Sequence, residues 1–205
     1  VVAGQSSSRL GNSPNRQEWL TQTPQNVPVT VSQAPDGLRF EGGHDGYLKT
    51  HGLTHARTLD LTFDGRAVAG EDMLLALSEA DKRRFDKAMD AVTLQGIPFA
   101  VRFHLHPDVD ASLDMGGAAV SMALRSGEIW VFRTDGRVKL SLESSVYLEK
   151  SRLKPRATKQ IVLSGRMMEY ATRTRWSLAK AQDTPIGIRD LTPDAIEPAP
   201  VYDDD

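Results

Sequence analysis

The sequence predicts an all-β fold, a large antiparallel β-sandwich of two packed sheets with one short amphipathic helix. Apolar and polar residues alternate over many short segments, as they do in strands with one buried face. Turn signals separate these segments roughly every 8–12 residues, a spacing typical of sandwiches. The chain has 205 residues, of which 40% are hydrophobic, so it can bury a sizeable core.

The composition excludes several classes of function. Lys and Arg number 25 and Asp and Glu 27, so the formal net charge is -2 and no global positive field attracts nucleic acid. The chain has no Cys, which excludes disulfides, thiolate zinc sites and a thiol nucleophile. No apolar run is long enough for a membrane span and no signal peptide is visible. Because the chain begins with Val1, we expect a fragment of a longer polypeptide, and its cellular location is unknown.

Three regions differ in composition. Residues 1–35 are expected to form an N-terminal strand and an irregular loop segment, with an edge strand around Pro28. Residues 36–180 are expected to form the β-sandwich domain. Residues 181–205 are rich in Pro and Asp and predict a flexible tail.

The sandwich domain contains most of the alternating segments. We expect strands at residues 38–41, 56–63, 67–74, 97–109, 118–124, 128–133, 138–142, 146–149, 160–164 and 170–178. A glycine-lined turn is expected at residues 42–47, and Asp64-Gly65 predicts a two-residue hairpin turn. Short turns after residues 124 and 133 predict a three-stranded meander.

One amphipathic helix interrupts these strands. Ser78 and Asp81 can form a capping box, and Phe85, Met89 and Val92 recur at helical spacing. Charged residues occupy the opposite face, so this helix is expected to lie on the surface.

His104 and His106 lie in the strand expected at residues 97–109. Since side chains alternate along a strand, the two imidazoles share one face, while Phe103 and Leu105 face the core. Such a pair can form structural hydrogen bonds, bind a ligand, transfer protons or hold a metal. A cupin-like metal site is disfavoured, because it needs a further histidine on a later strand and none follows His106.

Four more residues are candidates for substrate binding: His44, Tyr47, His55 and Arg57. His44 follows two glycines, which allow close approach to a partner, although local hydrogen bonds within a turn are the alternative. His55 could share a proton or an ion with His51 across a hairpin, or lie exposed at a strand end.

Arginine side chains offer a further way to bind an acidic ligand. Arg57, Arg102, Arg173 and Arg175 could clamp a sulfate or a carboxylate, although arginines are also common on the polar faces of sheets. No catalytic residue and no metal ligand is assigned within this chain.

Three groups of segments together resemble the carboxy-terminal part of heparinase II/III-like proteins, which are bacterial polysaccharide lyases. The segments are Gly43-His44-Asp45-Gly46-Tyr47 with Thr54-His55-Ala56-Arg57, then Arg102 to Val109, then Val146-Tyr147 with Gln160 to Gly165. They occur in the family's order over residues 38–180. The resemblance implies a β-sandwich that lies beside an α/α-toroid domain in the parent protein.

The resemblance also implies a chemistry. Such lyases remove the C5 proton of a uronic acid and expel the C4 oxygen by β-elimination, which requires neutralisation of the carboxylate, a base and an acid. In the family, the toroid supplies donors and a Tyr, and an early His-x-His motif supplies an imidazole and metal ligands. His104 and His106 have that spacing but different surroundings, so no catalytic role is carried onto them.

Several expectations follow from the resemblance. The family's metal ligands, for zinc or calcium, are expected upstream of this chain, so the fragment itself needs no cofactor and is expected to be inactive. Its expected partners are an anionic polysaccharide and the N-terminal α/α-toroid of the same polypeptide, in a periplasmic or secreted protein. The alternative is a non-catalytic carbohydrate-binding or structural sandwich that docks on a helical domain.

Overall fold

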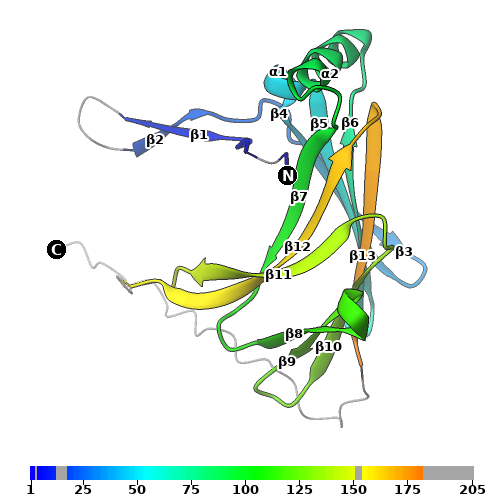
Figure 1. The fold of residues 1–205 in the computed structure, drawn as a ribbon. Helices are drawn as coiled ribbons and strands as arrows, with labels where there is room; N and C mark the ends of the chain where they lie inside the picture. The colour runs from blue at the N-terminus through cyan, green and yellow to red at the C-terminus, as the bar shows by residue number, and fades with distance from the viewer. Residues whose placement is uncertain (3, 13–17, 151–153, 182–205) are drawn as a thin grey trace, which may run out of the picture.

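A computed structural model describes residues 1–2, 4–12, 18–150 and 154–181. Within these residues the fold is almost entirely antiparallel β-structure, in which a large sheet packs against a small one (Figure 1). The predicted class, an all-β sandwich of two packed sheets, is confirmed. No helix in these ranges has the length and apolar character that crossing a membrane requires.

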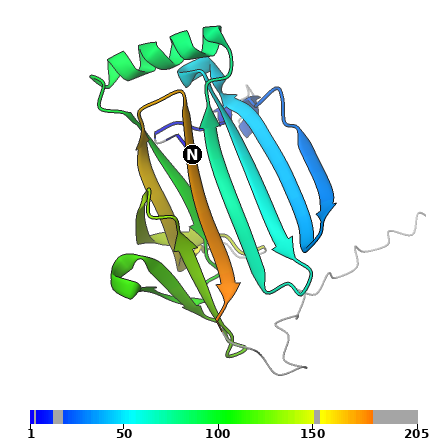
Figure 2. The same ribbon diagram turned by 90° about the vertical axis from the view of Figure 1, so that its right-hand side faces the viewer.

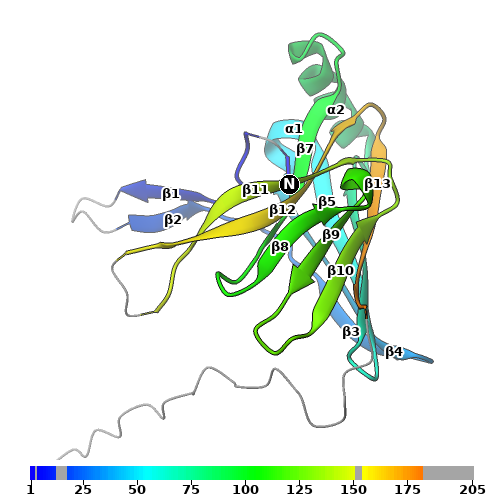
Figure 3. The ribbon, with the colours of Figure 1, turned by 60° about the horizontal axis from the view of Figure 1, so that its bottom comes forward.

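The large sheet has eight strands in the order β3-β4-β5-β6-β13-β10-β9-β8. Their bounds are β3 Val29–Ala34, β4 Gly37–Tyr47, β5 Leu53–Thr62, β6 Ala67–Leu75, β8 Asp110–Asp114, β9 Ala119–Ala123, β10 Ile129–Thr134 and β13 Ala171–Lys180. Strand β3 lies at an edge of this sheet, as Pro28 predicts. Strand β13, the last in sequence, lies in the interior of the sheet between β6 and β10 (Figure 3).

The small sheet has three strands in the order β11-β12-β7. Their bounds are β7 Ile97–His104, β11 Lys139–Tyr147 and β12 Arg156–Met167. Val2 forms an isolated bridge with Phe99 of β7. A separate hairpin of β1 (Arg9–Asn12) and β2 (Glu18–Gln22) projects from the body (Figure 1).

The predicted amphipathic helix is confirmed as α2 (Glu79–Ala91), which lies across one end of the sandwich (Figure 2). The side chain of Ser78 accepts a hydrogen bond from the Asp81 backbone, and the Asp81 side chain accepts one from the Ser78 backbone. This is the expected capping box. A single-turn helix α1 (Leu48–His51) and a 3-10 helix η1 (Met115–Gly117) are also present.

Two apolar clusters hold these layers together. Under α2, Phe85 and Met89 pack with Leu53, Leu74 and Ile97. The second cluster lies between the two sheets and contains the residues Val101, Ala111, Val120, Met122, Phe132, Ile161, Leu163 and Trp176. Phe103 and Leu105 pack against this second cluster, as the alternation of their strand predicts.

The turn predicted at residues 42–47 is wrong, because β4 continues through this segment to Tyr47. The glycines permit close packing rather than a turn. A Cβ atom on Gly43 would lie 2.9 Å from the His55 carbonyl oxygen, and one on Gly46 would lie 2.6 Å from Ser7 Cβ. The strand therefore needs glycine because its neighbours lie so close.

Two predicted connections also differ from the structure. Strand β5 ends at Thr62 and β6 begins at Ala67, so the four residues 63–66 connect them. The turn at Asp64-Gly65 is therefore longer than the predicted two residues. Of the three strands predicted to form a meander, only β9 and β10 pair with each other. The third strand, β11, belongs to the small sheet and pairs with β12. The predicted tail lies, from residue 182 on, outside the described residues.

Candidate functional site

His44 and His55 form a contact pair across neighbouring strands. They are register partners in β4 and β5, so both side chains lie on the same face of the large sheet. Nε2 of His44 lies 3.3 Å from Nδ1 of His55, and the ring centroids are 5.1 Å apart. Two of the predicted candidates therefore meet directly.

The hydrogen bonds around this pair define its tautomers. The Gly46 backbone N–H donates to His44 Nδ1 over 3.2 Å, so Nδ1 is unprotonated and Nε2 carries the hydrogen. His44 Nε2 then donates to His55 Nδ1, which leaves the proton of His55 on Nε2. That nitrogen donates to Oδ1 of Asp72 over 2.8 Å. Both ring nitrogens of both histidines are thus engaged within the protein.

Asp72 of β6 is the residue on which this network converges. Its side chain is only 3% exposed, and it also accepts hydrogen bonds from Arg57 Nε at 2.8 Å and Trp176 Nε1 at 2.9 Å. Burial by itself raises the pKa of Asp72, but hydrogen bonds from His55, Arg57 and Trp176 outweigh it and hold the pKa below 3.8. A buried carboxylate in such a setting is stable as the anion.

The sequence interpretation missed Asp72, although a signal was present. In the alternation of β6, Asp72 has the same parity as Val68 and Leu74, which face the core, whereas Glu71 has the opposite parity. An acidic residue at a core-facing position requires paired donors from other strands. That requirement would have identified Asp72 as the centre of a polar network.

Tyr47 and Arg57 complete this group. The Tyr47 ring is buried and lies 5.4 Å from the His44 ring, and its hydroxyl accepts a hydrogen bond from the Val1 amine. The Arg57 guanidinium lies 5.7 Å from the centre of the Phe103 ring. Burial lowers the pKa of His44, with a further contribution from His55, and burial raises the pKa of Tyr47. The structure thus brings four predicted candidates together.

His51 does not join this cluster. Its Nδ1 contacts the Thr50 hydroxyl at 2.9 Å, while His55 contacts His44 and Asp72. The interpretation in which His51 and His55 face each other across a hairpin is therefore wrong. The short helix α1 and the chain reversal at Gly52, where φ is +66°, separate the two positions.

His104 and His106 lie elsewhere, on the outer side of the small sheet. His104 is the last residue of β7, and its Nδ1 contacts the Ser145 hydroxyl of β11 at 2.7 Å. His106 lies beyond the strand, and its ring meets that of Tyr147 edge-on at 4.9 Å. The single strand predicted at residues 97–109 therefore ends early. Both histidines are exposed, and they form a second group separate from the His44 network.

All four arginines considered as anion clamps are paired with carboxylates. Arg57 contacts Asp72, Arg102 contacts Glu143 at 3.0 Å, and both Arg173 and Arg175 contact Glu71. Within the described ranges, no group of three or more His, Cys, Asp or Glu side chains is placed to hold a metal ion. Metal ligands upstream of this chain stay a prediction.

Comparison with known proteins assigns the family. The model of the family described as "Heparinase II/III-like, C-terminal" matches residues 1–177. FtsZ-localized protein C of Caulobacter vibrioides is 32% identical over 169 residues, which are 80% of this chain and 27% of that protein.

Solved structures share the fold. Heparan sulfate lyase HepC of Pedobacter heparinus gives a TM-score of 0.57 at 10% identity, over 78% of this chain and 22% of that chain. Heparinase III gives 0.56 at 10% identity, over 82% and 23%. The chain thus spans about a quarter of the length of these proteins. Because the family model covers most of the chain, the protein belongs to the heparinase II/III-like, C-terminal domain family.

Proposed function

We propose that this chain is the β-sandwich domain of a polysaccharide lyase that cleaves uronic-acid-containing polysaccharides by β-elimination. The family match and the fold shared with HepC and heparinase III support this proposal. The domain contributes a scaffold and part of the substrate-binding surface. The base and the groups that neutralise the substrate carboxylate come from the helical α/α-toroid of the same polypeptide.

The observation that carries the proposal is the family match over residues 1–177. The hydrogen-bonded chain from Gly46 through His44 and His55 to Asp72 indicates what this domain contributes. A general base needs an imidazole nitrogen with a free lone pair within reach of the substrate proton. The nitrogens of His44 and His55 are already occupied, so this network positions side chains rather than removing a proton. We expect the isolated domain to be inactive, because the proposed base lies on the upstream helical domain.

The second histidine group supports a role in binding an acidic glycan. His104 is exposed and uses only Nδ1 in the contact with Ser145, while the exposed Arg102 lies two positions before it on the same face of β7. A free imidazole nitrogen can donate to uronate or sulfate groups, and the exposed Arg102–Glu143 pair can exchange Glu143 for a substrate anion. Glycan-array binding of the chain, repeated with His104→Ala and His44→Ala, tests this role. We expect His104→Ala to weaken the binding of acidic glycans more than that of neutral ones.

A lyase assay tests the proposed reaction. The substrate is an acidic oligosaccharide, and the ultraviolet absorbance of the unsaturated product is followed. We expect no turnover by the 205-residue chain and turnover by the longer polypeptide that includes the upstream helical domain. Turnover by the chain alone, or none by the longer polypeptide, would contradict the proposal.

A second candidate function is a non-catalytic sandwich that binds carbohydrate or docks on a helical domain. It is favoured by the Caulobacter vibrioides relative, whose name describes it as FtsZ-localized. The same assay separates the two candidates. A parent polypeptide that binds acidic glycans yet releases no unsaturated product would support the non-catalytic module.

A further inference from the structure

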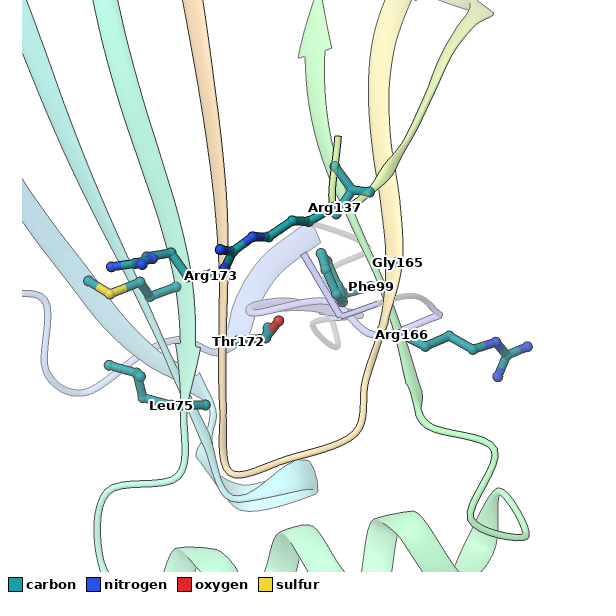
Figure 4. Close-up of a pocket in the computed structure, with 10 residues that line it drawn as sticks. Leu75, Phe99, Arg137, Gly165, Arg166, Thr172 and Arg173 are labelled. Atoms are coloured by element: carbon teal, nitrogen blue, oxygen red, sulfur yellow. The ribbon is translucent and has the colours of Figure 1, made fainter. Parts of the chain in front are cut away.

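A pocket of about 420 Å³ lies between the two sheets, on the side where β13 faces β12 (Figure 4). Its walls come from β6 and β13 of the large sheet, from β7 and β12 of the small sheet, and from the connection between β10 and β11. This volume falls in the range of small-ligand sites, about 300–1,000 Å³. None of the residues proposed so far to bind substrate lines it, apart from Arg173.

One wall of the pocket is an unpaired edge of β13. The pairing of β13 with β10 ends at Trp176 and Thr134, and Asp135 N–H donates to the Arg175 carbonyl just beyond it. Because backbone groups alternate in direction along a strand, the N–H and C=O of Arg173 and Ala171 point to the same side as those of Arg175. Within the described residues, no strand pairs with this end of β13 on that side. Backbone donors are thus available at the pocket.

The charged side chains that line the pocket are all cationic. They are Arg137, Arg166 and Arg173, and no acidic residue is among the described lining residues. Figure 4 shows Arg137 extending from the small-sheet side toward β13, whereas Arg166 points away. The Arg166 guanidinium donates to the carbonyl oxygens of Gln95 and Gly96. Arg137 is therefore the cation directed toward a ligand, while Arg173 extends from the rim of the pocket toward Glu71 on the outer face of the large sheet (Figure 4).

Both of these arginines are weakly paired. Arg137 lies 3.8 Å from Asp135, and its side chain is 67% exposed. Arg173 lies 3.6 Å from Glu71, which is held more closely by Arg175 at 2.7 Å. Exposed pairs at such distances contribute little and exchange readily for a better oxyanion partner. A sulfate or carboxylate can accept two parallel hydrogen bonds from one guanidinium. Asp135 and Glu71 form no such bidentate pair with Arg137 and Arg173.

We propose that this pocket binds the sulfate or carboxylate group of an acidic saccharide. Arg137 donates to the oxyanion, the backbone N–H groups at the free edge of β13 supply further donors, and Arg173 adds positive charge at the rim (Figure 4). Phe99, Val138 and Met73 provide apolar surface for the sugar ring. The saccharide nature of the ligand rests on the function proposed above, while the oxyanion specificity rests on the pocket itself.

Isothermal titration calorimetry of the chain tests this site with three probes: a sulfated heparin-derived disaccharide, the neutral disaccharide lactose, and sodium sulfate. We expect the sulfated disaccharide to bind more tightly than free sulfate, and lactose not to bind. Arg137→Gln should raise the Kd for the sulfated disaccharide about tenfold, since it removes a charge-assisted hydrogen bond, and Arg173→Gln, which removes only a charge at the rim, should raise the Kd less.

Arg39→Gln is the matched control. Arg39 pairs with Asp60 at 2.7 Å and does not line this pocket, yet its substitution removes the same charge. The Kd of Arg39→Gln for the sulfated disaccharide should stay within about twofold of the wild-type value, because specific contacts contribute more than net charge. Circular dichroism melting of each variant verifies that it is folded.

An unchanged Kd in Arg137→Gln, or an equal rise of the Kd in Arg39→Gln, would overturn the site. If the sulfated disaccharide binds no more tightly than free sulfate, the proposal that the ligand is a saccharide is wrong. Failure of the proposed lyase function has a different signature, namely no unsaturated product from the longer polypeptide. That result would leave the arginine dependence of the Kd unaffected.

Discussion

The indole Nε1 of Trp176 donates a hydrogen bond of 2.9 Å to the Asp72 carboxylate, although 104 positions separate the two residues in the sequence. The indole also stacks on Phe132, with ring centroids 5.6 Å apart and planes 16° apart. One side chain therefore joins the polar network of His44, His55 and Asp72 to the apolar core between the sheets. This relationship links the stability of the core to the geometry of the network.

Gly70→Ala should destabilise the domain. A Cβ atom on Gly70 would overlap the Trp176 indole, which lies directly against this backbone. The indole has to shift, which weakens both its hydrogen bond to Asp72 and its stacking. We expect a loss of about 1–3 kcal/mol in the free energy of unfolding, measured with urea. Ala69→Ser, on the exposed face of the same strand, is the control and should change it by less than about 0.5 kcal/mol.

Asp72→Asn should lower the free energy of unfolding more than the same change at an exposed aspartate does. It leaves Arg57 without its carboxylate and places an amide NH2 opposite a donor, either His55 and Arg57 at the Oδ1 position or Trp176 at the Oδ2 position. We expect a loss of about 3 kcal/mol in the free energy of unfolding. Asp60→Asn removes an exposed partner of Arg39 and should cost only a small fraction of that. Equal losses in the two variants would show that the Asp72 network does not stabilise the fold.

The domain should lose stability as the pH falls below 6.5. Burial lowers the pKa of His44 in the folded state, so near pH 6.5 the unfolded chain binds more protons than the folded one. This difference stabilises the folded state fully above pH 6.5, and the stabilisation decreases as the pH falls toward the lowered pKa of His44. Urea unfolding at about pH 7.5 and about pH 5.5 measures the difference.

His44→Gln should reduce this pH dependence. Some pH dependence of the stability should remain, because burial lowers the pKa of His51 as well. The same pH dependence in wild type and His44→Gln would mean that His44 does not titrate differently in the two states.

Ser78→Ala should remove the cap of α2. The Ser78 hydroxyl accepts a hydrogen bond from the Asp81 backbone N–H, whose other acceptor is the Ser78 carbonyl three positions before it. We expect a loss of about 1 kcal/mol, observed as a lower melting temperature. Lys87→Ala, on the exposed face of α2, should leave the melting temperature nearly unchanged. A loss of similar size in that control would indicate that the helix responds to any substitution.

Local patterns in the sequence were sufficient for most of the elements. The apolar spacing of Phe85 and Met89 and the cap at Ser78 define α2, and Phe103 and Leu105 face the core as alternation requires. These predictions depend on interactions within a few residues, which the sequence displays directly. They hold because burial follows the periodicity of each element.

Long-range pairing could not be inferred in the same way. Asp135-Gly136 has the composition of a hairpin turn, yet the chain there changes sheets, because β11 finds its partner in β12 rather than in β10. The strand β8 (Asp110–Asp114) was missed, because it is short and has an acidic residue at each end. Tertiary packing decides both outcomes.

The candidate site was predictable in part. His44, Tyr47, His55 and Arg57 were selected from glycine-rich and basic surroundings, and the structure brings them together. Their common partner Asp72 was not selected, since its role depends on strand parity and on a tryptophan far along the chain. The convergence on one carboxylate appears only when β4, β5, β6 and β13 are aligned.

The position of β13 also determines when this domain can fold during synthesis. Among the described strands, β3–β6 and β8–β10 form two half-sheets that meet only through β13, the last of these strands to be translated. Until Lys180 has left the ribosome, β6 and β10 each present an unpaired edge that can join a neighbouring nascent chain. Slow translation before that point therefore exposes this domain to misassembly, and shielding by a chaperone is most valuable in that interval.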